Sequence, residues 1–385
     1  MDEDIELENS EAWYMGNIRN ALVDNVSDLG TDNIDRVVDT LAELTANDQA
    51  VKICEKISMP KLVNDDVKEA VENLTLDSIR FMVSMYYRYQ KSRIAFNQQK
   101  NALSDAEKSN LCVTSFSNLT MSCERFIQTV MAHFCEVHPV TKWCISNRGV
   151  GPVLAAGLLA HIRIKDEKDN IIAPTVGHIW SFAGWDPTRK WISSAEAQTA
   201  IKRQGFNPSS TKLIDNESIE KIVEDLGGDR RMLFGLDLSE DIKTKDFYNT
   251  VVKRPHNAEF KKLCFKLGES FMHVSGHEDR NYGTIYKERK AYESAKNENK
   301  DYAEQAEAGA KRVGAGTEAI KWYKKGMLPP GHIHARAKRY AVKIFLAHLH
   351  EVMYRYYTGE APPKPYPIVH LGHAHEIRPF VPTTV

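Results

Sequence analysis

The stretch SNRGVGPVLAAGLLAHI, residues 146–162, constrains the fold more than any other part of the sequence. It places Gly149 and Gly151 on either side of one valine, follows them with Pro152, and continues in small and apolar residues typical of a helix. Proline suits the first position of a helix, because its missing N–H would have no partner there. With a short helix expected at residues 140–146, the pattern predicts a helix–hairpin–helix with a glycine turn.

The glycine turn has the chemistry of an anion site. Glycine lacks a Cβ, so the backbone can adopt a positive φ and a phosphate can approach it closely. The N–H groups and the positive dipole end of the second helix point toward the same place, and Arg148 adds a charge. We therefore predict contacts to DNA phosphates from Arg148, Gly149, Val150 and Gly151.

Two other interpretations of the turn stay open. A Rossmann-type nucleotide loop needs a third glycine where this chain has Leu154, and it needs a buried strand before the turn. The preceding residues 140–147, VTKWCISN, are too mixed for such a strand. A turn with a purely structural role would have the same residues. The pattern favours binding of the DNA backbone, with little sequence readout.

The overall composition is that of a globular protein. The chain has 385 residues, of which 42% are hydrophobic and 27% charged, so it can bury a sizeable core. No apolar run approaches the length of a membrane span, and the first residues lack the features of a secretory signal. Six cysteines without a Cys-x-x-Cys pair favour reduced thiols. We expect a cytoplasmic protein with no membrane partner.

Charge is distributed unevenly along the chain. Residues 1–50 contain 13 acidic and two basic side chains, a balance of −11, whereas the remainder has 49 basic and 39 acidic side chains, a balance of +10. A basic body is typical of a protein that meets a polyanion such as DNA. The acidic head could bind a protein partner, or it could be a well-solvated helical region.

The segment pattern predicts a mainly α fold. Residues 1–135 have helical spacing throughout and form an acidic-headed N-terminal domain. A helix–hairpin–helix domain is expected over residues 139–358, with a small β-hairpin near 162–173 and an insertion at about 205–256. Residues 359–385 are an extended tail rich in proline and histidine.

Basic helices extend the expected DNA contact. A long charged helical arm is expected from residue 279 to about 312, and a final helix after two prolines that stops at Gly359. The cations that we assign to DNA phosphates here are Lys261, Lys262, Arg336, Lys338, Arg339 and Lys343.

Five segments follow one another in a characteristic order: RGVGPVLAAGLLAHI, IWSFAGWDPTRKW, NAEFKKLCFKLGESFMH, YKERKAYE and HIHARAKRYAVKIFLAHLHEVMYRYY. Over about residues 139–358 this order resembles the C-terminal domain of the IS-one-ten family of insertion-sequence transposases. The resemblance implies a protein of a phage or mobile element that acts in DNA recombination. Residues 1–135 show no apolar strand that ends in aspartate, so the RuvC-like N-terminal domain of the family is not expected.

The resemblance also implies a catalytic serine shortly after an Ala-Gly-x-x-Pro segment, here residues 183–187. Ser193 and Ser194 follow that segment, and magnesium would be needed only if they were catalytic. Ser193 and Glu196 also have the spacing of a capping box for the next helix, which we favour. We expect no other cofactor.

Histidines of the tail raise the question of a metal site. His370, His373 and His375 are residue types that bind zinc or nickel. However, the tail is extended and offers only Glu376 as a further ligand close by, so we predict no metal site.

Three functions are consistent with these observations. The first is a DNA-binding protein of a phage or mobile element that grips the backbone. The second is an active transposase or recombinase that uses Ser193 or Ser194. The third is an interaction protein that recruits replication or transcription machinery through residues 1–50. A homo-oligomer is compatible with each of them.

Overall fold

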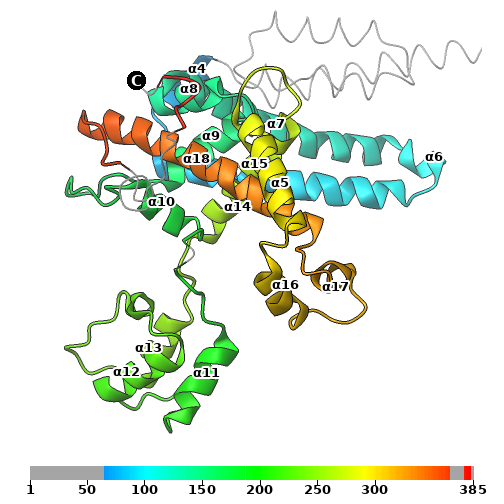
Figure 1. Cartoon of the computed structure of the whole chain (residues 1–385). Coiled ribbons are helices and arrows are strands. Elements are labelled where there is room, and N and C mark those ends of the chain that lie inside the picture. The colour runs from blue at the N-terminus through cyan, green and yellow to red at the C-terminus, as the bar shows by residue number, and fades with distance from the viewer. Residues whose placement is uncertain (1–64, 187, 365–376, 383–385) are drawn as a thin grey trace, which may run out of the picture. The chain divides into compact units, whose positions relative to one another are not determined.

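The computed structural model describes residues 65–186, 188–364 and 377–382, and it divides into two compact units, Met1–Val137 and His138–Val385. Helices make up most of the described residues (Figure 1). Two isolated antiparallel bridges, Lys165 with Ile171 and Leu213 with Lys243, are the β pairings found among them. The predicted mainly α fold is therefore confirmed.

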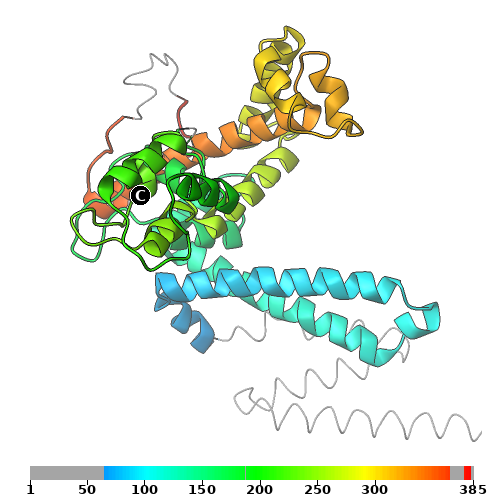
Figure 2. The same cartoon turned by 90° about the horizontal axis from the view of Figure 1, so that it is seen from below.

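The described part of the first unit is a helical hairpin. Helices α5 (Leu76–Asn101) and α7 (Leu111–Val137) run antiparallel, with the short α6 (Asp105–Lys108) in the turn and α4 (Asp65–Glu72) against α7 (Figure 2). A partly buried ion pair between Arg93 Nε and Glu124 Oε2, at 2.7 Å, joins the two long helices. The acidic residues 1–50 lie outside the described residues.

The second unit is built around its last helix. Helix α18 (Pro330–Thr358) packs on α8 (Pro139–Ser146), α10 (Val176–Phe182), α14 (Ala258–His273) and α15 (Tyr282–Glu298), while α9 (Pro152–His161) packs on α8 and α14. Stacked and edge-on aromatic rings fill the centre, with centroids 5.1–5.7 Å apart; they belong to Trp143, Phe271, Tyr282 and Phe345. As predicted, α18 ends at Gly359, whose φ of +76° suits the left-handed cap.

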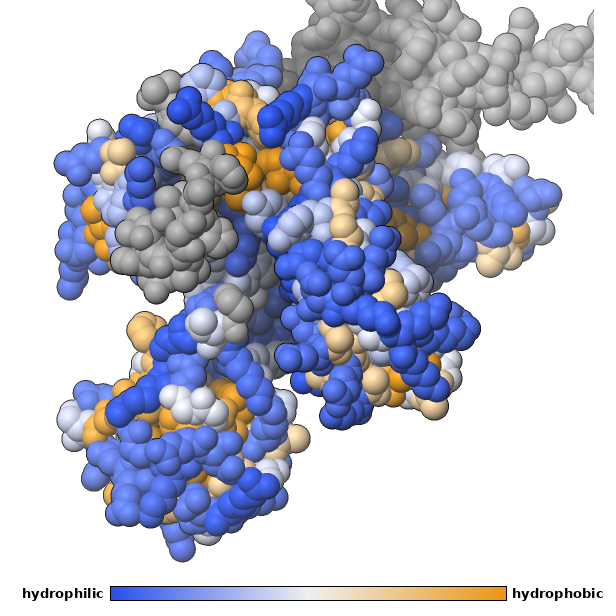
Figure 3. All heavy atoms as spheres, in the orientation of Figure 1, coloured by the Kyte–Doolittle hydropathy of each residue, from blue (hydrophilic) through white to orange (hydrophobic). Residues whose placement is uncertain are grey.

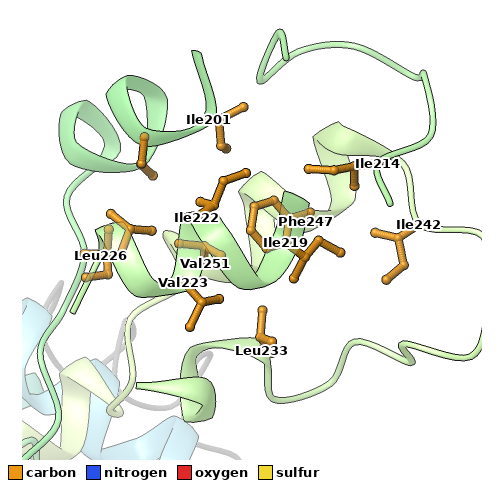
Figure 4. Packing of buried hydrophobic residues seen from close by; sticks show 13 residues of the cluster. Ile201, Ile214, Ile219, Ile222, Val223, Leu226, Leu233, Ile242, Phe247 and Val251 are labelled. Carbon is orange, nitrogen blue, oxygen red and sulfur yellow. The ribbon is translucent and has the colours of Figure 1, made fainter. Parts of the chain in front are cut away.

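A helical module follows α10. Helices α11 (Ser194–Arg203), α12 (Asn216–Asp225) and α13 (Thr244–Val251), with the 3-10 turn η2 (Arg230–Leu233), share a separate hydrophobic core (Figure 4). Ile201, Ile219, Ile222 and Phe247 are fully buried in this core. On the face shown in Figure 3, hydrophilic residues cover most of this module. The insertion predicted at 205–256 thus shares its core with a helix that precedes it, because Ala197 and Ile201 of α11 complete the apolar cluster.

Two local predictions need correction. The charged arm is not one helix: α15 stops at Glu298, the chain turns through Lys300 at φ +62°, and α16 (Ala303–Ala310) and α17 (Glu318–Tyr323) follow. Near 162–173 the predicted hairpin is limited to one antiparallel bridge, and Asp166 Oδ1 closes its turn by accepting the N–H groups of Lys168 and Asn170.

The end of the tail packs against the second unit. Trp143 Nε1 donates to the carbonyl of Val381 at 3.3 Å, His348 Nε2 donates to that of Ile377 at 2.8 Å, and Phe380 lies edge-on to Tyr282. Residues 365–376, with His370, His373 and His375, lie outside the described residues.

Candidate nucleic-acid interface

Helices α8 and α9 form the predicted helix–hairpin–helix. Helix α8 ends at Ser146, and the buried Asn147 donates its side-chain N–H to the carbonyl of Trp143 at 2.8 Å. The N–H of Val150 then donates to the carbonyl of Asn147 at 3.0 Å, and α9 begins at Pro152. The turn is therefore fixed by backbone and side-chain hydrogen bonds at the end of α8.

Gly149 has a structural reason to be glycine. Its φ is +93°, a conformation that side chains with a Cβ rarely adopt. A Cβ at this position would lie 3.1 Å from Val274 Cγ2 and 3.2 Å from Phe271 Cδ1, and the Gly149 carbonyl accepts a hydrogen bond from Ser270 Oγ at 2.5 Å. Gly149 thus lets the turn lie directly on the end of α14.

Gly151 has no such reason. It is exposed at the N-cap of α9 with φ −84° and ψ 164°, which any residue can adopt, and a Cβ there would meet nothing within 4 Å. Serine, threonine, aspartate or asparagine would cap the helix with a side-chain oxygen, and this N-cap makes no side-chain hydrogen bond. The N-cap of α9 therefore has no side chain of its own to satisfy the first N–H groups of the helix.

The other two predicted turn residues play different parts. The Val150 side chain is buried at 5% exposure and anchors the turn in the core. Arg148 is exposed, and its Nη2 forms an ion pair with Asp279 Oδ2 at 2.5 Å. Exposed pairs of this kind contribute about 0–1 kcal/mol, so a phosphate can compete for the guanidinium.

An open pocket of about 410 Å³ adjoins the turn. Asn147 and Arg148 line it from the hairpin, Arg280 and Asn281 from the start of α15, and Phe380 from the tail. Asn281 caps α15, since its Oδ1 accepts the N–H of Gly283 at 2.7 Å. The pocket is therefore lined by two arginines and two amides, together with the Asp279 carboxylate that pairs with Arg148.

The basic residues of α14 and α18 are in two different situations. Lys261 is half-buried, and Lys262 pairs with Glu259 on the surface at 2.8 Å. Arg339 is exposed, and Lys343 lies 4.9 Å from the ring centre of Trp180, where burial lowers the pKa of its ammonium.

Arg336 and Lys338 instead carry internal contacts. Lys338 is 9% exposed and pairs with Glu269. Arg336 Nε donates to Glu293 Oε2 at 2.7 Å, and its guanidinium lies 4.5 Å from the ring centre of Tyr302. These two cations therefore hold helices together, and their assignment to DNA stays a prediction.

The contact around Glu293 was not predicted from the sequence. Glu293 on α15 is 1% exposed and accepts hydrogen bonds from Arg289, Arg336 and Tyr302. Burial raises the pKa of this carboxyl, but the three hydrogen bonds outweigh it and lower the pKa overall. The carboxylate thereby ties α15 and the segment before α16 to α18. Arg289 and Glu293 at i and i+4 on one face were the available sequence signal.

The predicted catalytic serines lie at the start of α11. The Ser193 hydroxyl accepts the N–H of Glu196 at 3.2 Å, and Glu196 accepts the N–H of Ser193 at 2.9 Å, which is the predicted capping box. Glu196 also pairs with Lys190, and these hydrogen bonds lower its pKa to about 2. Gln198 Nε2 donates to the Tyr248 hydroxyl at 3.2 Å, and this hydrogen bond, with a smaller contribution from Ser194, lowers the pKa of that phenol. A catalytic role for either serine stays a prediction.

The described residues contain neither a cluster of metal ligands nor a helix that could span a membrane. Within the described part of the chain, no cluster of three or more histidine, cysteine, aspartate or glutamate side chains could hold an ion. No described helix is long and apolar enough to cross a membrane.

Comparison with known protein families, with characterised proteins and with solved structures returned no match. The resemblance to insertion-sequence transposases therefore stays an expectation from the segment order.

Proposed function

We propose that this protein binds DNA through its backbone, with the α8–α9 hairpin as the phosphate contact and with little sequence readout. The main observation in support of this proposal is Gly151. It is a glycine that the fold does not require, at a helix N-cap where common polar residues would stabilise the chain.

The chemistry of an exposed helix N-terminus supports this function. The first N–H groups of an α-helix have no partner within the helix, and together with the helix dipole they attract anions. A side chain at Gly151 would fill the space through which a phosphate oxygen approaches. Arg148, next to the turn, adds a guanidinium that suits phosphate.

The proposal also accounts for the expected lack of sequence readout. Contacts from backbone N–H groups and arginine to phosphate oxygens position a protein on DNA but carry no base information. The described hairpin presents a short turn, and apart from Pro152 and Leu154, which are partly exposed, the residues of α9 up to Ala160 are buried. Helix α9 up to Ala160 therefore has no continuous exposed face for the major groove.

Substitution at Gly151 tests the proposal. Gly151→Asp caps α9 but places a negative charge where the phosphate would lie, so we expect duplex affinity at about 50 mM salt to fall by about tenfold or more. Gly151→Ser caps the helix without a charge and should weaken binding less. Both variants should keep or raise the melting temperature, and a loss of binding at an unchanged melting temperature would not reflect unfolding. If Gly151→Asp binds a short duplex as the unmodified chain does, the hairpin is not the contact.

A further inference from the structure

A second aromatic and basic surface lies where the chain enters and leaves the α11–α13 module. The two connecting segments, residues 188–193 and 252–257, run side by side below α10 in Figure 1. Trp191 Nε1 donates to the carbonyl of Val252 at 3.1 Å and joins them. We call this pair of segments the neck.

The Trp191 ring is held in place but remains open to solvent. Its indole N–H is fixed by Val252, and the Arg254 guanidinium lies 5.0 Å from the ring centre. Trp191 is nevertheless 49% exposed. A large aromatic surface that is already ordered loses little conformational entropy when a flat ligand stacks on it.

Positive charge is concentrated in the segment that holds this ring. Lys253 and Arg254 are exposed, and neither forms an ion pair with a carboxylate among the described residues. Burial lowers the pKa of His256, and the charges of Lys261 and Arg254 lower it further, which reports a positive field at this point. The nearby carboxylate of Asp186 is bound by Thr188 and Arg231, and Glu196 is bound by Lys190.

We propose that the neck binds single-stranded DNA, with an unpaired base stacked on Trp191 and the flanking phosphates on Lys253 and Arg254. Stacking on an aromatic ring requires a base face that duplex DNA does not expose, whereas cations beside the ring follow the backbone of a single strand. This inference rests on the proposed DNA binding and adds a substrate class to it. A hairpin that grips phosphates and a neck that stacks an unpaired base together favour DNA with a duplex and a single-stranded segment.

The experiment uses the full chain and three labelled substrates: a single strand of about 16 nucleotides, its duplex, and that duplex with a single-stranded tail. Fluorescence anisotropy gives each affinity. We expect Trp191→Ala to weaken binding of the single strand and of the tailed duplex by about tenfold or more, and to leave the blunt duplex within about twofold. Trp191→Phe keeps a stacking ring but loses the hydrogen bond to Val252, and should stay within about threefold on all substrates.

Two controls separate this inference from a structural role and from the proposed function. Melting temperatures show whether Trp191→Ala remains folded, and Trp191→Phe isolates stacking from the hydrogen bond. Stacking also predicts that single-stranded DNA quenches the emission of the unmodified chain more than that of Trp191→Phe. The inference is overturned if Trp191→Ala binds the single strand normally, if it loses both blunt duplex and single strand equally, or if Trp191→Phe fails as Trp191→Ala does. A normal duplex affinity of Gly151→Asp would instead refute the hairpin contact alone.

Discussion

The hairpin turn and the last helix both contain residues suited to DNA, but those of the last helix are largely engaged in contacts within the protein. At the turn, Gly151 gives α9 an N-cap without a side chain, although the fold does not need a glycine there. On α18, Arg336 and Lys338 are bound to Glu293 and Glu269 inside the second unit.

This difference shows that the exposure of a polar group, and its pairing within the protein, determine whether it can bind a ligand or instead stabilises the fold. A cation that compensates a buried carboxylate cannot leave it without a large loss of stability. A group that binds phosphate must be available without a large loss of stability. The N–H groups of a helix N-terminus and a cation in an exposed ion pair meet this condition.

The Glu293 contact should be the most costly to break. Glu293→Gln leaves Arg289 and Arg336 without their carboxylate, and we expect the free energy of unfolding in urea to fall by about 3–5 kcal/mol. The exposed Glu298→Gln on the same helix is the control and should change stability by less than about 0.5 kcal/mol. A small loss of unfolding free energy for Glu293→Gln would mean that the ion pairs of Arg289 and Arg336 contribute little to stability.

The same carboxylate should make stability depend on pH. Because the pKa of Glu293 is lowered in the folded protein, its contribution is present above the unfolded value of about 4.3 and is lost as the pH falls toward the lowered pKa. Unfolding free energy measured from pH 6 downward, in roughly half-unit steps, should therefore fall more steeply for the unmodified chain than for Glu293→Gln. Parallel curves would contradict the assigned direction.

The two glycines of the turn should respond in opposite ways. Gly149→Ala forces a side chain into a positive φ and against Val274 and Phe271, so we expect a loss of about 1–3 kcal/mol in unfolding free energy. Gly151→Ser should gain a few tenths of a kcal/mol from the new cap. Equal losses at both positions would show that Gly151 is structural as well.

The capping box of α11 should have an intermediate effect. Ser193→Ala removes the acceptor for the Glu196 N–H, and we expect a loss of about 1 kcal/mol. Ser194→Ala, one residue later, should cost less than about 0.5 kcal/mol because Ser194 is exposed and is not the N-cap residue. Chemical denaturation measures both. In a competent recombination assay, unchanged activity of the double variant would remove the predicted catalytic role.

The smallest effect is expected at Asp279. Asp279→Asn removes the exposed ion pair of Arg148, so the guanidinium meets a phosphate without competition, and duplex affinity should rise about twofold to fivefold. The matched control is Asp237→Asn, an exposed aspartate in the α11–α13 module that should leave affinity unchanged. A weaker complex with Asp279→Asn would indicate that Asp279 orients Arg148 for binding.

Local sequence patterns predicted several helix boundaries, but they could not predict ion pairs between residues far apart in the chain. Pro152 and the glycines placed the start of α9, Gly359 the end of α18, and Ser193 with Glu196 the cap of α11. These signals act within a few residues of chain. The partners of Arg336 and Lys338 lie 43 and 69 residues away, so charge and spacing alone could not distinguish them from exposed cations.

The two roles of the glycine pair were likewise hidden in the sequence. Both residues fit the same turn pattern, and only the position of Phe271 and Val274 in the fold shows that Gly149 is structural. The shared core of the module was missed for a similar reason, because Ile201 and Phe247 meet across a long stretch of mostly polar chain.

The salt dependence of duplex binding tests the central claim most directly. The logarithm of affinity should fall linearly with the logarithm of salt concentration, because each neutralised phosphate releases counterions. We predict that Gly151→Asp lowers the magnitude of this slope by about 1 for each phosphate that the variant no longer binds, with an unchanged or higher melting temperature. An absence of duplex binding at about 50 mM salt, or an identical slope and affinity for both proteins, would contradict the assignment of the hairpin as the phosphate contact.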